Sequence, residues 1–421
     1  MNDLNLKEKQ SEFSFKISKK KDSCFPLMRS GTITTPHGDI QTPAFIPVAT
    51  RATIKGVSPE IMRSIGAQAL LANAYHLRLR PGENILDSAG GLGKFMNWNG
   101  PTFTDSGGFQ VMSLGVGFKK VVAMSVQENS TSGNLLSKKK QQLAFIDQDG
   151  VTFKSHLDGS SLRFTPEISL EVQHAIGADI MFAFDELTTL FHTRDYQIES
   201  LKTRTHPWSV RSLQAHAELT RKRADKPYQA LFAVLQGANF EDLRRQTSQY
   251  LSNVEVEGLD FDGFGIGGAL EKERLGDIIS WCTTELNSAG AEDKPRHLLG
   301  ISAVSDLFLG VENGVDTFDC VSPAREARNG ALYTPSGRIN VKNAKYRADF
   351  TPVYDQCDCY TCANYTKSYL AHLIKSGEMF GATLATIHNE RFILRLVDDI
   401  RESIQTGNYQ EFKADFFARA E

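Results

Sequence analysis

The stretch "QALFAVLQGANFEDLRRQTSQYLSNVEVEGLDFDGFGIGG" (229–268) decides the fold that the sequence predicts. It opens with a continuous apolar run at 229–238, continues with apolar residues at helical spacing at 239–255, and returns to an apolar run at 261–268. Continuous runs of this length are typical of strands buried on both faces, as in a parallel sheet. The stretch therefore predicts a strand, a helix and a second strand.

Similar apolar runs recur along the chain, and helix-like segments lie between them. The segment 58–66 has a helix start at Ser58 and Pro59 and a stop at Gly66, and 165–177 repeats this pattern with Thr165 as the cap. Eight alternations of strand and helix predict a (β/α)₈ TIM barrel, and the alternative is an open doubly wound sheet. The other six runs are "TPAFIPVAT" (42–50), "AQALLANAY" (67–75), "PTFTDSGG" (101–108), "ADIMFAFDE" (178–186), "RHLLGIS" (296–302) and "VDTFDCVSP" (315–323).

Composition narrows the class of protein. The chain has 421 residues, of which 41% are hydrophobic and 23% charged, and its formal net charge is −3. It is therefore no globally basic coat for nucleic acid, and any contact with nucleic acid must come from a local patch. No apolar run reaches the roughly 18–20 residues of a membrane helix, and the polar start lacks the apolar middle of a signal peptide. We expect a cytoplasmic protein without a membrane partner.

Three of the six cysteines are crowded together in "CDCYTC" (357–362). Crowded thiols in an intracellular chain indicate metal binding before disulfides. A tetrahedral zinc site of the closed, structural type is predicted here. Its ligands are the thiolates of Cys357, Cys359 and Cys362 and the imidazole of His388. His372 is the alternative fourth ligand. We expect one structural Zn²⁺ per subunit, whose binding stabilises a small lobe.

Three regions are predicted from these patterns. Residues 1–24 form a flexible N-terminal extension, and 25–345 form the barrel, with a polar surface insertion at 119–142. Residues 346–421 form a zinc-binding subdomain with C-terminal helices. The alternating segment 150–164, which contains "DGS", predicts a hairpin within the barrel region.

Polar residues gather at the ends of the predicted strands. In a barrel, these carboxyl ends build the active site. Two carboxylates that face one substrate carbon suit glycosyl chemistry, in which one attacks and the other transfers a proton. The residues alone leave open which aspartate does which. The strand-end residues are Asn73, Asp105, Ser106, Asp185, Glu186, Gln236, Gly267, Gly268, Asp319 and Cys320.

Several motifs in order make the chain resemble the tRNA-guanine transglycosylases, also called queuine tRNA-ribosyltransferases. The resemblance implies a barrel with an inserted zinc subdomain, usually as a homodimer, that replaces guanine at the wobble position of a tRNA anticodon with a 7-deazaguanine base. The expected substrates are tRNAs of the Asp, Asn, His and Tyr type with a GUN anticodon. The motifs are "TPAFIPVAT" (42–50), "NAYHLRLRPG" (73–82), "DSGGFQVMSL" (105–114), "FKSHLDGS" (153–160), "LQGA" (235–238), "GIGG" (265–268), "FDCVSPAREARNG" (318–330) and the cysteine–histidine set.

The resemblance also implies a role for each matching residue. Asp319 is the nucleophile that attacks ribose C1′, and Asp105 is the general acid and base for the leaving and entering base. Asp316 and Cys320 are expected to point away from the pocket, because neighbouring side chains of a strand alternate. The base is expected between Phe109 and Leu299, with its edge bound by Ser106, Asp185, Gln236 and Gly268. The tRNA contacts are Arg325 and Arg328, on a loop after the nucleophile, and Asn73.

Two positions depart from the bacterial pattern for the small prequeuosine base. Leu187 stands where a cysteine is typical, and Ala269 stands where a leucine is typical. A smaller residue after Gly268 gives the hypothesis of an enlarged pocket for queuine, and either deazaguanine stays open as the incoming substrate.

Two other functions are alternatives to the base-exchange enzyme. One is a non-catalytic RNA-binding subunit of the same family, which the presence of both Asp105 and Asp319 disfavours. The other is a barrel glycosidase or nucleosidase, which would need neither the zinc lobe nor the arginines of "AREARNG" (324–330).

Overall fold

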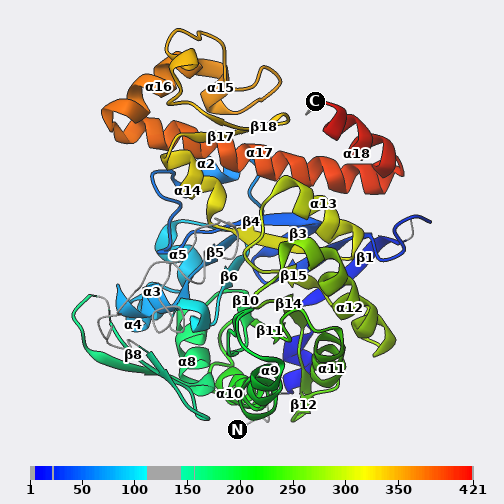
Figure 1. Ribbon diagram of the computed structural model, residues 1–421. Helices are drawn as coiled ribbons and strands as arrows, with labels where there is room; N and C mark the ends of the chain where they lie inside the picture. Colours follow the sequence, from blue (N-terminus) through cyan, green and yellow to red (C-terminus); the bar gives the residue numbers. More distant parts are fainter. Residues whose placement is uncertain (1–4, 21–22, 111–143, 156, 420–421) are drawn as a thin grey trace, which may run out of the picture. The chain divides into compact units, whose positions relative to one another are not determined.

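The computed structural model of the protein describes residues 5–20, 23–110, 144–155 and 157–419 (Figure 1). The polar insertion predicted at 119–142 lies outside these residues. The described ranges contain no helix that combines the length and the hydropathy of a membrane span.

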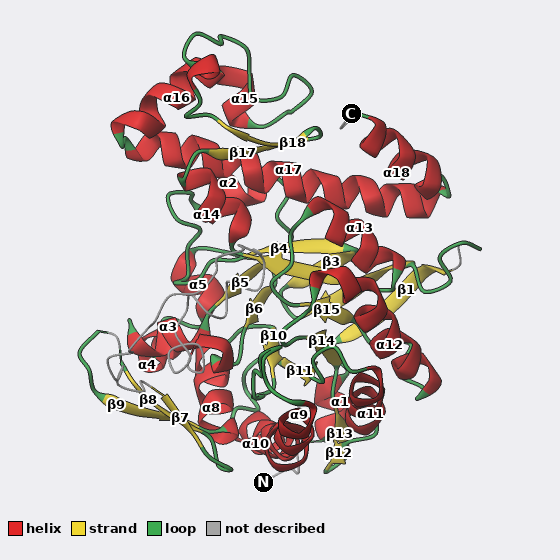
Figure 2. Ribbon diagram, in the orientation of Figure 1, coloured by secondary structure: helices red, strands yellow, loops and turns green. Residues whose placement is uncertain are grey.

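Eight strands form the central sheet (Figure 2), in the hydrogen-bonded order β4-β16-β15-β14-β11-β10-β6-β5. Each strand lies within one of the eight apolar runs of the sequence, and the pairs described in detail are parallel. A parallel bridge between Val48 and Leu71 connects the two ends of this order, so the sheet closes and the prediction of a barrel is confirmed. The strands are β4 (Ala44–Pro47), β5 (Leu70–Ala72), β6 (Thr102–Thr104), β10 (Ile180–Phe182), β11 (Ala230–Leu235), β14 (Gly263–Ile266), β15 (Arg296–Leu298) and β16 (Thr317–Cys320).

Continuous burial explains why these strands read as apolar runs rather than as alternating patterns. Every residue of β4, β11 and β14 is buried. A strand covered on both faces has no position for a solvated side chain, which is the usual situation in a parallel barrel. Solvated polar side chains therefore have room only where a strand ends, and polar side chains within the strands, such as Thr317 of β16, are buried.

The chain divides into two compact units. The first comprises Met1–Ser11, Asn73–Ser88 and Thr104–Glu292. Its helix α8 (Pro166–Ile176) starts where the Thr165 hydroxyl accepts the amide hydrogen of Ile168, and it ends at Gly177, as predicted. Its other elements are α1 (Leu6–Gln10), α3 (Ala74–Leu79), α4 (Glu83–Ser88), β7 (Ala144–Ile146), β8 (Val151–Lys154), β9 (Ser161–Phe164), α9 (Arg194–Ser200), a π-helical turn (Leu201–Thr205), α10 (His206–Lys222), α11 (Glu241–Ser252), β12 (Glu255–Val256), β13 (Leu259–Asp260), a 3₁₀ turn (Lys272–Arg274) and α12 (Leu275–Ser288), besides β10, β11 and β14.

The hairpin predicted at 150–164 is confirmed, because β8 and β9 pair antiparallel with β7 as a third strand. Aromatic side chains from this small sheet pack with barrel residues of the same unit. Phe164 stacks on Phe184 at 6.2 Å between ring centroids, and Phe184 lies 5.1 Å from Trp208. This cluster anchors the hairpin.

The second unit comprises Glu12–Ala72, Ala89–Phe103 and Asp293–Glu421. Its long helix α17 (Met379–Thr406) runs alongside α14 (Ser322–Arg328), as Figure 1 shows. Residues from α14, β17, α16 and α17 share a buried apolar core. The other elements are β1 (Ser14–Lys20), β2 (Arg29–Thr35), β3 (Gly38–Thr42), α2 (Pro59–Ser64), α5 (Leu92–Met96), α13 (Val304–Glu312), β17 (Ala331–Thr334), β18 (Gly337–Asn340), a 3₁₀ turn (Ala344–Tyr346), α15 (Tyr360–Asn364), α16 (Lys367–Ser376) and α18 (Tyr409–Ala418), besides β4, β5, β15 and β16.

The predicted extension, 1–24, contains both α1 and β1. Gln10 of α1 donates through Nε2 to Asp260 Oδ1 at 3.1 Å and Asp262 Oδ1 at 2.9 Å, while β1 pairs antiparallel with β2. The predicted region boundaries after 24 and 345 stay predictions.

Candidate active site

Asp105 follows β6, and the surrounding chain holds its carboxylate in place. The backbone N–H of Ala74 donates to Oδ1 at 2.9 Å, and the backbone N–H of Gly107 donates to the same oxygen at 3.2 Å. The side-chain amide of Asn73 donates to Oδ2. These three groups are N–H donors, which suit the acceptor-only carboxylate form. These contacts hold the Asp105 carboxyl group in one orientation at the end of β6.

Asn73 caps a helix and binds Asp105, two structural roles that the sequence did not indicate. It is 3% exposed, and its Oδ1 accepts the backbone N–H of His76 at 2.9 Å as the cap of α3. Its Nδ2 donates to Asp105. Both ends of this amide are used within the protein, so Asn73 positions Asp105 relative to α3.

Asp185 and Gln236 meet at the ends of β10 and β11. Gln236 Nε2 donates to Asp185 Oδ2 at 2.6 Å. Burial raises the pKa of Asp185 to about 6, although the hydrogen bond from Gln236 opposes this rise. Gln236 Oε1 is buried without a hydrogen-bond partner in the described part of the chain. A carboxyl, an amide and an unsatisfied acceptor thus present a hydrogen-bonding edge suited to a planar polar ligand.

Gly268, after β14, closes against this amide. A Cβ atom placed on Gly268 would lie 2.3 Å from Gln236 Oε1, and its backbone has φ +92°, where side chains other than glycine are strained. Both the spacing and the backbone therefore require glycine. Ala269, the next residue, is buried.

Arg244 supports these strand ends from behind, and the sequence reasoning missed it. Its guanidinium is fully buried and donates to the backbone carbonyls of Leu235 and Ala238, each at 2.8 Å, and of Gly267 at 2.9 Å. It thereby ties the turn after β11 to the turn after β14. The available signal was an arginine on the buried face of an amphipathic helix, α11.

Glu186 is already bound by three side chains of the protein at this strand end. Tyr196 donates to its Oε1 at 2.7 Å, Ser200 donates to its Oε2 at 2.5 Å, and Arg204 forms an ion pair with it. Of the two adjacent acids, Asp185 is therefore the one suited to ligand binding.

The remaining predicted base contacts differ in exposure. Ser106 is buried, and its Oγ accepts the backbone N–H of Gly108 at 3.2 Å. The Phe109 side chain is 42% exposed, which leaves an aromatic face available for stacking. Leu299, in the second unit, is partly buried after β15. Leu187 packs against the aromatic cluster of the β7–β9 sheet.

Asp319, on β16 of the second unit, is anchored through one carboxylate oxygen. Its Oδ1 accepts the backbone N–H of Gly300 at 3.0 Å and lies 3.0 Å from His297 Nε2. No residue in the described ranges donates to Oδ2. One oxygen is thus fixed, and the other has its lone pairs available, as nucleophilic attack requires.

Two residues close to Asp319 in the sequence, Asp316 and Cys320, are buried within the protein. Asp316 is fully buried and accepts Arg29 Nε at 2.9 Å and Nη2 at 2.5 Å, which makes it a buried ion pair. Cys320 is also buried, and burial raises the pKa of its thiol, so the reactive thiolate is disfavoured.

The two arginines after the nucleophile lie on a helix, so the prediction of a loop was wrong. Residues 322–328 form α14, whose second residue is Pro323 and whose alanines pack inward. Proline is tolerated in a first helical turn, and Ala, Glu and Arg are good helix formers. Arg325 is exposed, and Arg328 Nη1 donates to the Ala324 carbonyl at 2.9 Å. In the described part of the chain, neither arginine has an ion-pair partner.

Four residues of the second unit could hold a metal ion. The ligand atoms of Cys357, Cys359, Cys362 and His388 lie within 4.8 Å of one another. His388 Nδ1 is 3.7, 3.7 and 3.3 Å from the three sulfurs, close to the roughly 3.5 Å expected between ligands of a tetrahedral zinc site. His372 is exposed on α16 and is outside this group.

The histidine of this cluster is itself oriented. His388 Nε2 lies 2.7 Å from the carbonyl oxygen of Tyr333, so that Nε2 carries the proton and Nδ1 is left to bind metal. The adjacent Asn389 donates to the carbonyls of Pro323 and Ala331 and accepts the N–H of Tyr333. The metal cluster and α14 are thus tied to the same helix.

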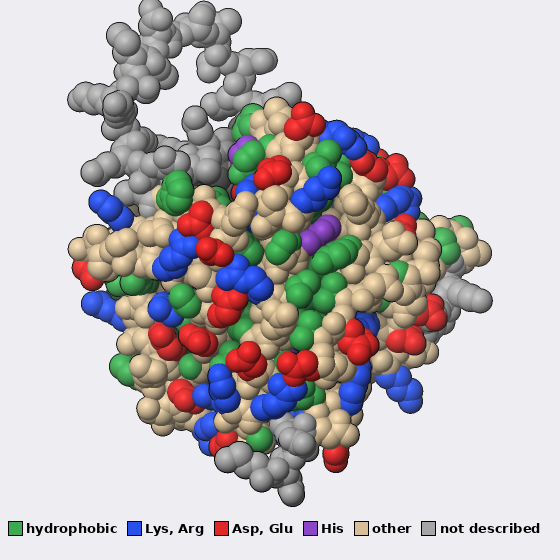
Figure 3. All heavy atoms as spheres, turned by 90° about the horizontal axis from the view of Figure 1, so that it is seen from below, with side chains coloured by type: hydrophobic (Ala, Val, Ile, Leu, Met, Phe, Trp, Pro, Cys, Tyr) green, Lys and Arg blue, Asp and Glu red, His purple; other side chains and the backbone are tan. Residues whose placement is uncertain are grey.

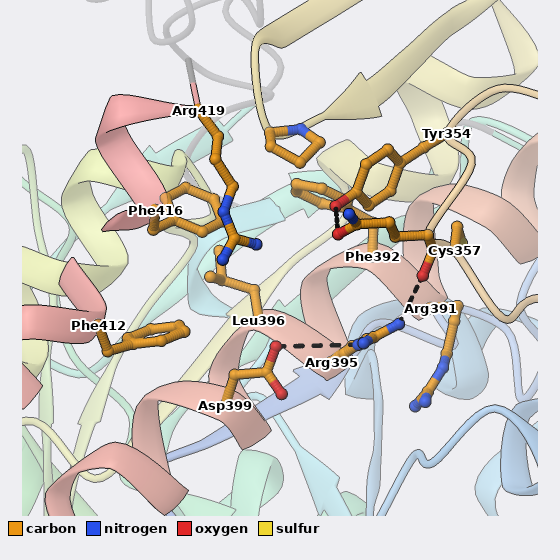
Figure 4. A pocket seen from close by; sticks show the side chains of 12 residues that line it. Tyr354, Cys357, Arg391, Phe392, Arg395, Leu396, Asp399, Phe412, Phe416 and Arg419 are labelled. Carbon is orange, nitrogen blue, oxygen red and sulfur yellow. Dashed lines mark hydrogen bonds and ion pairs between the residues drawn. The ribbon is translucent and has the colours of Figure 1, made fainter. Parts of the chain in front are cut away.

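A small pocket of about 80 Å³ lies among α17, α18 and the segment that carries Tyr354 and Cys357 (Figure 4). Arg391 on its wall pairs with Asp358 at 2.6 Å, and Arg395 lies 3.8 Å from Asp399. Because these charges are already neutralised within the protein, we assign the pocket no ligand.

The face in Figure 3 carries interspersed acidic and basic side chains. This mixture agrees with the small net charge of −3. Any nucleic-acid contact is therefore better sought at a local cationic site such as α14.

Comparisons with known proteins agree over nearly the whole chain. The family model described as Queuine tRNA-ribosyltransferase matches residues 24–421. A Queuine tRNA-ribosyltransferase of Lactococcus lactis subsp. cremoris (strain MG1363) is 45% identical over 391 residues, which cover 93% of this chain and 92% of the relative. The relative of the same name from Thermoanaerobacter pseudethanolicus is 44% identical, with coverage of 93% and 94%, and that from Desulforamulus reducens is 42% identical, with 95% and 97%.

A closed barrel with acids at its strand ends, together with these matches, defines an enzyme of the pentosyltransferase class. The chain belongs to the queuine tRNA-ribosyltransferase family and carries the transferase activity of that family.

Proposed function

We propose that the protein exchanges guanine at the wobble position of GUN-anticodon tRNAs for a 7-deazaguanine base through a covalent ribosyl–aspartate. Asp319 Oδ2 attacks ribose C1′, and the bond to guanine breaks with its electron pair passing to the guanine nitrogen. The observation that carries this proposal is the asymmetry of Asp319, whose Oδ1 has two donors while Oδ2 has none in the described ranges. The ester stores the glycosyl bond, so exchange needs no ATP.

Asp105 is the proton carrier of this proposal. In protonated form it delivers a proton to the departing guanine, and as a carboxylate it accepts the proton of the entering base. Exchange of guanine for guanine is symmetric, so one group must serve both directions. The three N–H donors around its carboxylate support the accepting half.

The base would be bound through the groups that meet after β10, β11 and β14. Asp185 accepts ring and amino N–H groups of the base, Gln236 and Ser106 add hydrogen bonds, and Gly268 gives the flat ligand room. Phe109 and Leu299 would cover its two faces. The unsatisfied Gln236 Oε1 supports this binding site, because a buried acceptor normally has a donor.

One experiment separates this function from the two alternatives. The protein is incubated with unmodified GUN-anticodon tRNA and labelled guanine, beside Asp319→Asn. Label incorporated by the wild type alone supports base exchange. Binding of tRNA without incorporation would support a non-catalytic subunit, and release of free base without exchange would support a nucleosidase.

The pH dependence of base binding should report on Asp185. Since burial raises the pKa of this carboxyl to about 6, it loses its charge as pH falls through 6 and can no longer accept two N–H groups. The KM for guanine is therefore expected to rise roughly tenfold for each pH unit below 6, as for a single required ionisation. The KM measured from pH 5 to 8 checks this, and Asp185→Asn, which cannot titrate, should give a high and flat profile.

Gly268→Ala is expected to weaken base binding. The new Cβ would lie 2.3 Å from Gln236 Oε1 and displace that amide. We expect the KM for guanine to rise roughly tenfold, the loss of about one hydrogen bond. Gly290→Ala is the matched control, because Gly290 also has a left-handed backbone, φ +79°, but no atom within 4 Å of the new Cβ. Equal effects of both substitutions on the KM would contradict this account.

Arg325, Arg328 and Asn73 are proposed to serve the anticodon loop, the arginines by direct contact and Asn73 through Asp105. Arginine binds phosphates and unstacked bases through its planar fork. Arg325→Ala should weaken tRNA binding roughly tenfold and flatten its salt dependence by about one phosphate contact. Arg338→Ala is the control, since Arg338 is already paired with Glu326 at 2.9 Å. Titration of tRNA binding against salt decides whether the two variants differ.

The choice between queuine and prequeuosine base depends on the space beside Gly268. Ala269, in place of a larger residue, supports the enlarged-pocket hypothesis for queuine. The test is to measure the exchange of tRNA guanine for queuine and for prequeuosine base separately. A protein that accepts prequeuosine base but not queuine would contradict the hypothesis.

The proposal also includes a metal ion and a cellular location. We propose one structural Zn²⁺ per subunit, bound by Cys357, Cys359, Cys362 and His388, since three thiolates and an imidazole suit zinc and leave it no open position. Thiolate ligands also fit the predicted cytoplasmic location, where thiols stay reduced.

A homodimer is proposed from the surface beside this cluster. Tyr365 stacks on Tyr369 at 5.4 Å and lies 5.6 Å from Phe380, and Tyr369 and Phe380 are exposed. Adjacent exposed aromatic side chains favour a protein interface. A monomeric mass in solution would contradict the dimer.

A further inference from the structure

We infer that His297 is a positioning residue that selects Oδ2 of Asp319 as the attacking atom and stabilises the carboxylate when the covalent ester breaks. This inference rests on the proposed role of Asp319 as the nucleophile. Neither the strand-end pattern nor the family resemblance pointed to His297, which lies inside β15 rather than at its end.

The histidine ring is held in one orientation. It is fully buried, its Nδ1 lies 2.9 Å from Thr317 Oγ1, and its Nε2 lies 3.0 Å from Asp319 Oδ1. The ring of Phe103 packs beside it, with 5.7 Å between centroids and 33° between planes. Thr317 and Asp319 point to the same side of β16, two residues apart, so one ring can contact both.

These contacts determine where the ring proton lies. A bare nitrogen would repel the lone pairs of an ionised Asp319, so Nε2 must carry hydrogen to make the contact with Oδ1. The Thr317 hydroxyl can donate to Nδ1, which leaves the proton of a neutral ring on Nε2. The N–H of His297 and the N–H of Gly300 therefore both donate to Oδ1.

Two donors on one oxygen have a chemical consequence. When Oδ2 forms its bond to C1′, Oδ1 becomes the carbonyl oxygen of a neutral ester and still accepts both hydrogen bonds. When the entering base takes C1′, the electron pair of the C1′–Oδ2 bond returns to the carboxylate. Hydrogen bonds to a carboxylate are stronger than those to a neutral carbonyl. His297 therefore shifts the balance between ester and free carboxylate towards the carboxylate.

The test measures this balance directly. With tRNA at a fixed guanine concentration, the covalent protein–tRNA adduct is trapped by denaturation and quantified. His297→Phe keeps the packing against Phe103 but removes the donor, so the ratio of ester to free enzyme should rise about tenfold. His297→Gln, whose Nε2 can replace the donor, should return the ratio towards wild type. A ratio unchanged in His297→Phe, or equal in the two variants, overturns the inference.

Controls separate this inference from the proposed function. Failure of wild type to form any adduct, or an adduct in Asp319→Asn, refutes the nucleophile itself. An adduct that depends on Asp319 but not on His297 refutes only the inference. His206→Phe is the matched control, because His206 also contacts a threonine hydroxyl, Thr247 Oγ1 at 3.2 Å, and stacks on Tyr250 but contacts no carboxylate among the residues that the structure describes. It should leave the ratio unchanged.

A second measurement leaves His297 unsubstituted, so it does not depend on whether a variant at that position folds. Nitrogen NMR of the wild-type protein with labelled histidine reports which ring nitrogen carries a proton. The expected result is a proton on Nε2 of His297, with a resonance that moves in Asp319→Asn. A bare Nε2 overturns the inference.

Discussion

Asp319→Asn is expected to lower the rate of base exchange by at least about a thousandfold, because a neutral amide cannot replace a carboxylate as nucleophile. The substitution keeps the size and shape of the side chain. Its Oδ1 can still accept the N–H groups of Gly300 and His297, so the end of β16 should keep its structure. Incorporation of labelled guanine into tRNA measures the loss.

This result identifies a nucleophile only if the Asp319→Asn variant still binds tRNA. The arginines proposed to contact tRNA lie on α14, beyond the substituted residue, and Asp319 makes no ion pair with them. The Kd for tRNA is therefore expected to stay within about threefold of wild type, as for loss of no direct contact. Full exchange by Asp319→Asn would refute the proposed mechanism, whereas joint loss of binding and unfolding would make Asp319 a structural residue.

Cys362→Ser is expected to release the metal and unfold the lobe around it. Serine is a poor zinc ligand, and Cys362 Sγ is the sulfur closest to His388 Nδ1, at 3.3 Å. Structural zinc contributes on the order of 10 kcal/mol to the folding of small metal domains. We expect zinc content to fall from one per chain to near zero, with a separate unfolding transition at lower temperature. Elemental analysis and calorimetry measure the two effects.

The control for this prediction is the same substitution at an exposed thiol. Cys24 lies outside the metal group and is exposed, so Cys24→Ser should keep both the metal and the melting temperature. Because Asn389 follows the ligand His388 and binds the carbonyls of Pro323 and Ala331, loss of metal should also loosen α14 and weaken tRNA binding. A Cys362→Ser protein that retains zinc would refute the ligand assignment.

The barrel could be predicted because strands that are buried along their whole length appear in the sequence as continuous apolar runs. A strand such as β11, buried at all positions, reads as one apolar run, and polar residues can follow only at its end. The metal cluster could also be predicted, because Cys357, Cys359 and Cys362 are so close in sequence that their thiols must lie near one another.

Residues whose role depends on a distant partner were not accessible in this way. His297 acts on a residue from the next strand, and Arg244 binds carbonyls after two different strands. Neither relation leaves a spacing pattern, because packing brings the partners together. Residues 322–328 were misjudged for another reason. They were assigned to a loop because they follow a strand end, yet proline in a first turn is compatible with a helix.

The closure of the barrel has a consequence for synthesis on the ribosome. Residues 44–47 of β4 pair with residues 317–320 of β16, so the first barrel strand must wait until residues 48–320, nearly two thirds of the chain, have been made. At about 5–20 residues per second, that interval is on the order of a quarter of a minute to one minute. Throughout it, an apolar strand has an unpaired edge. Newly made chains should therefore be more prone to edge-to-edge association until β16 emerges than the finished protein is.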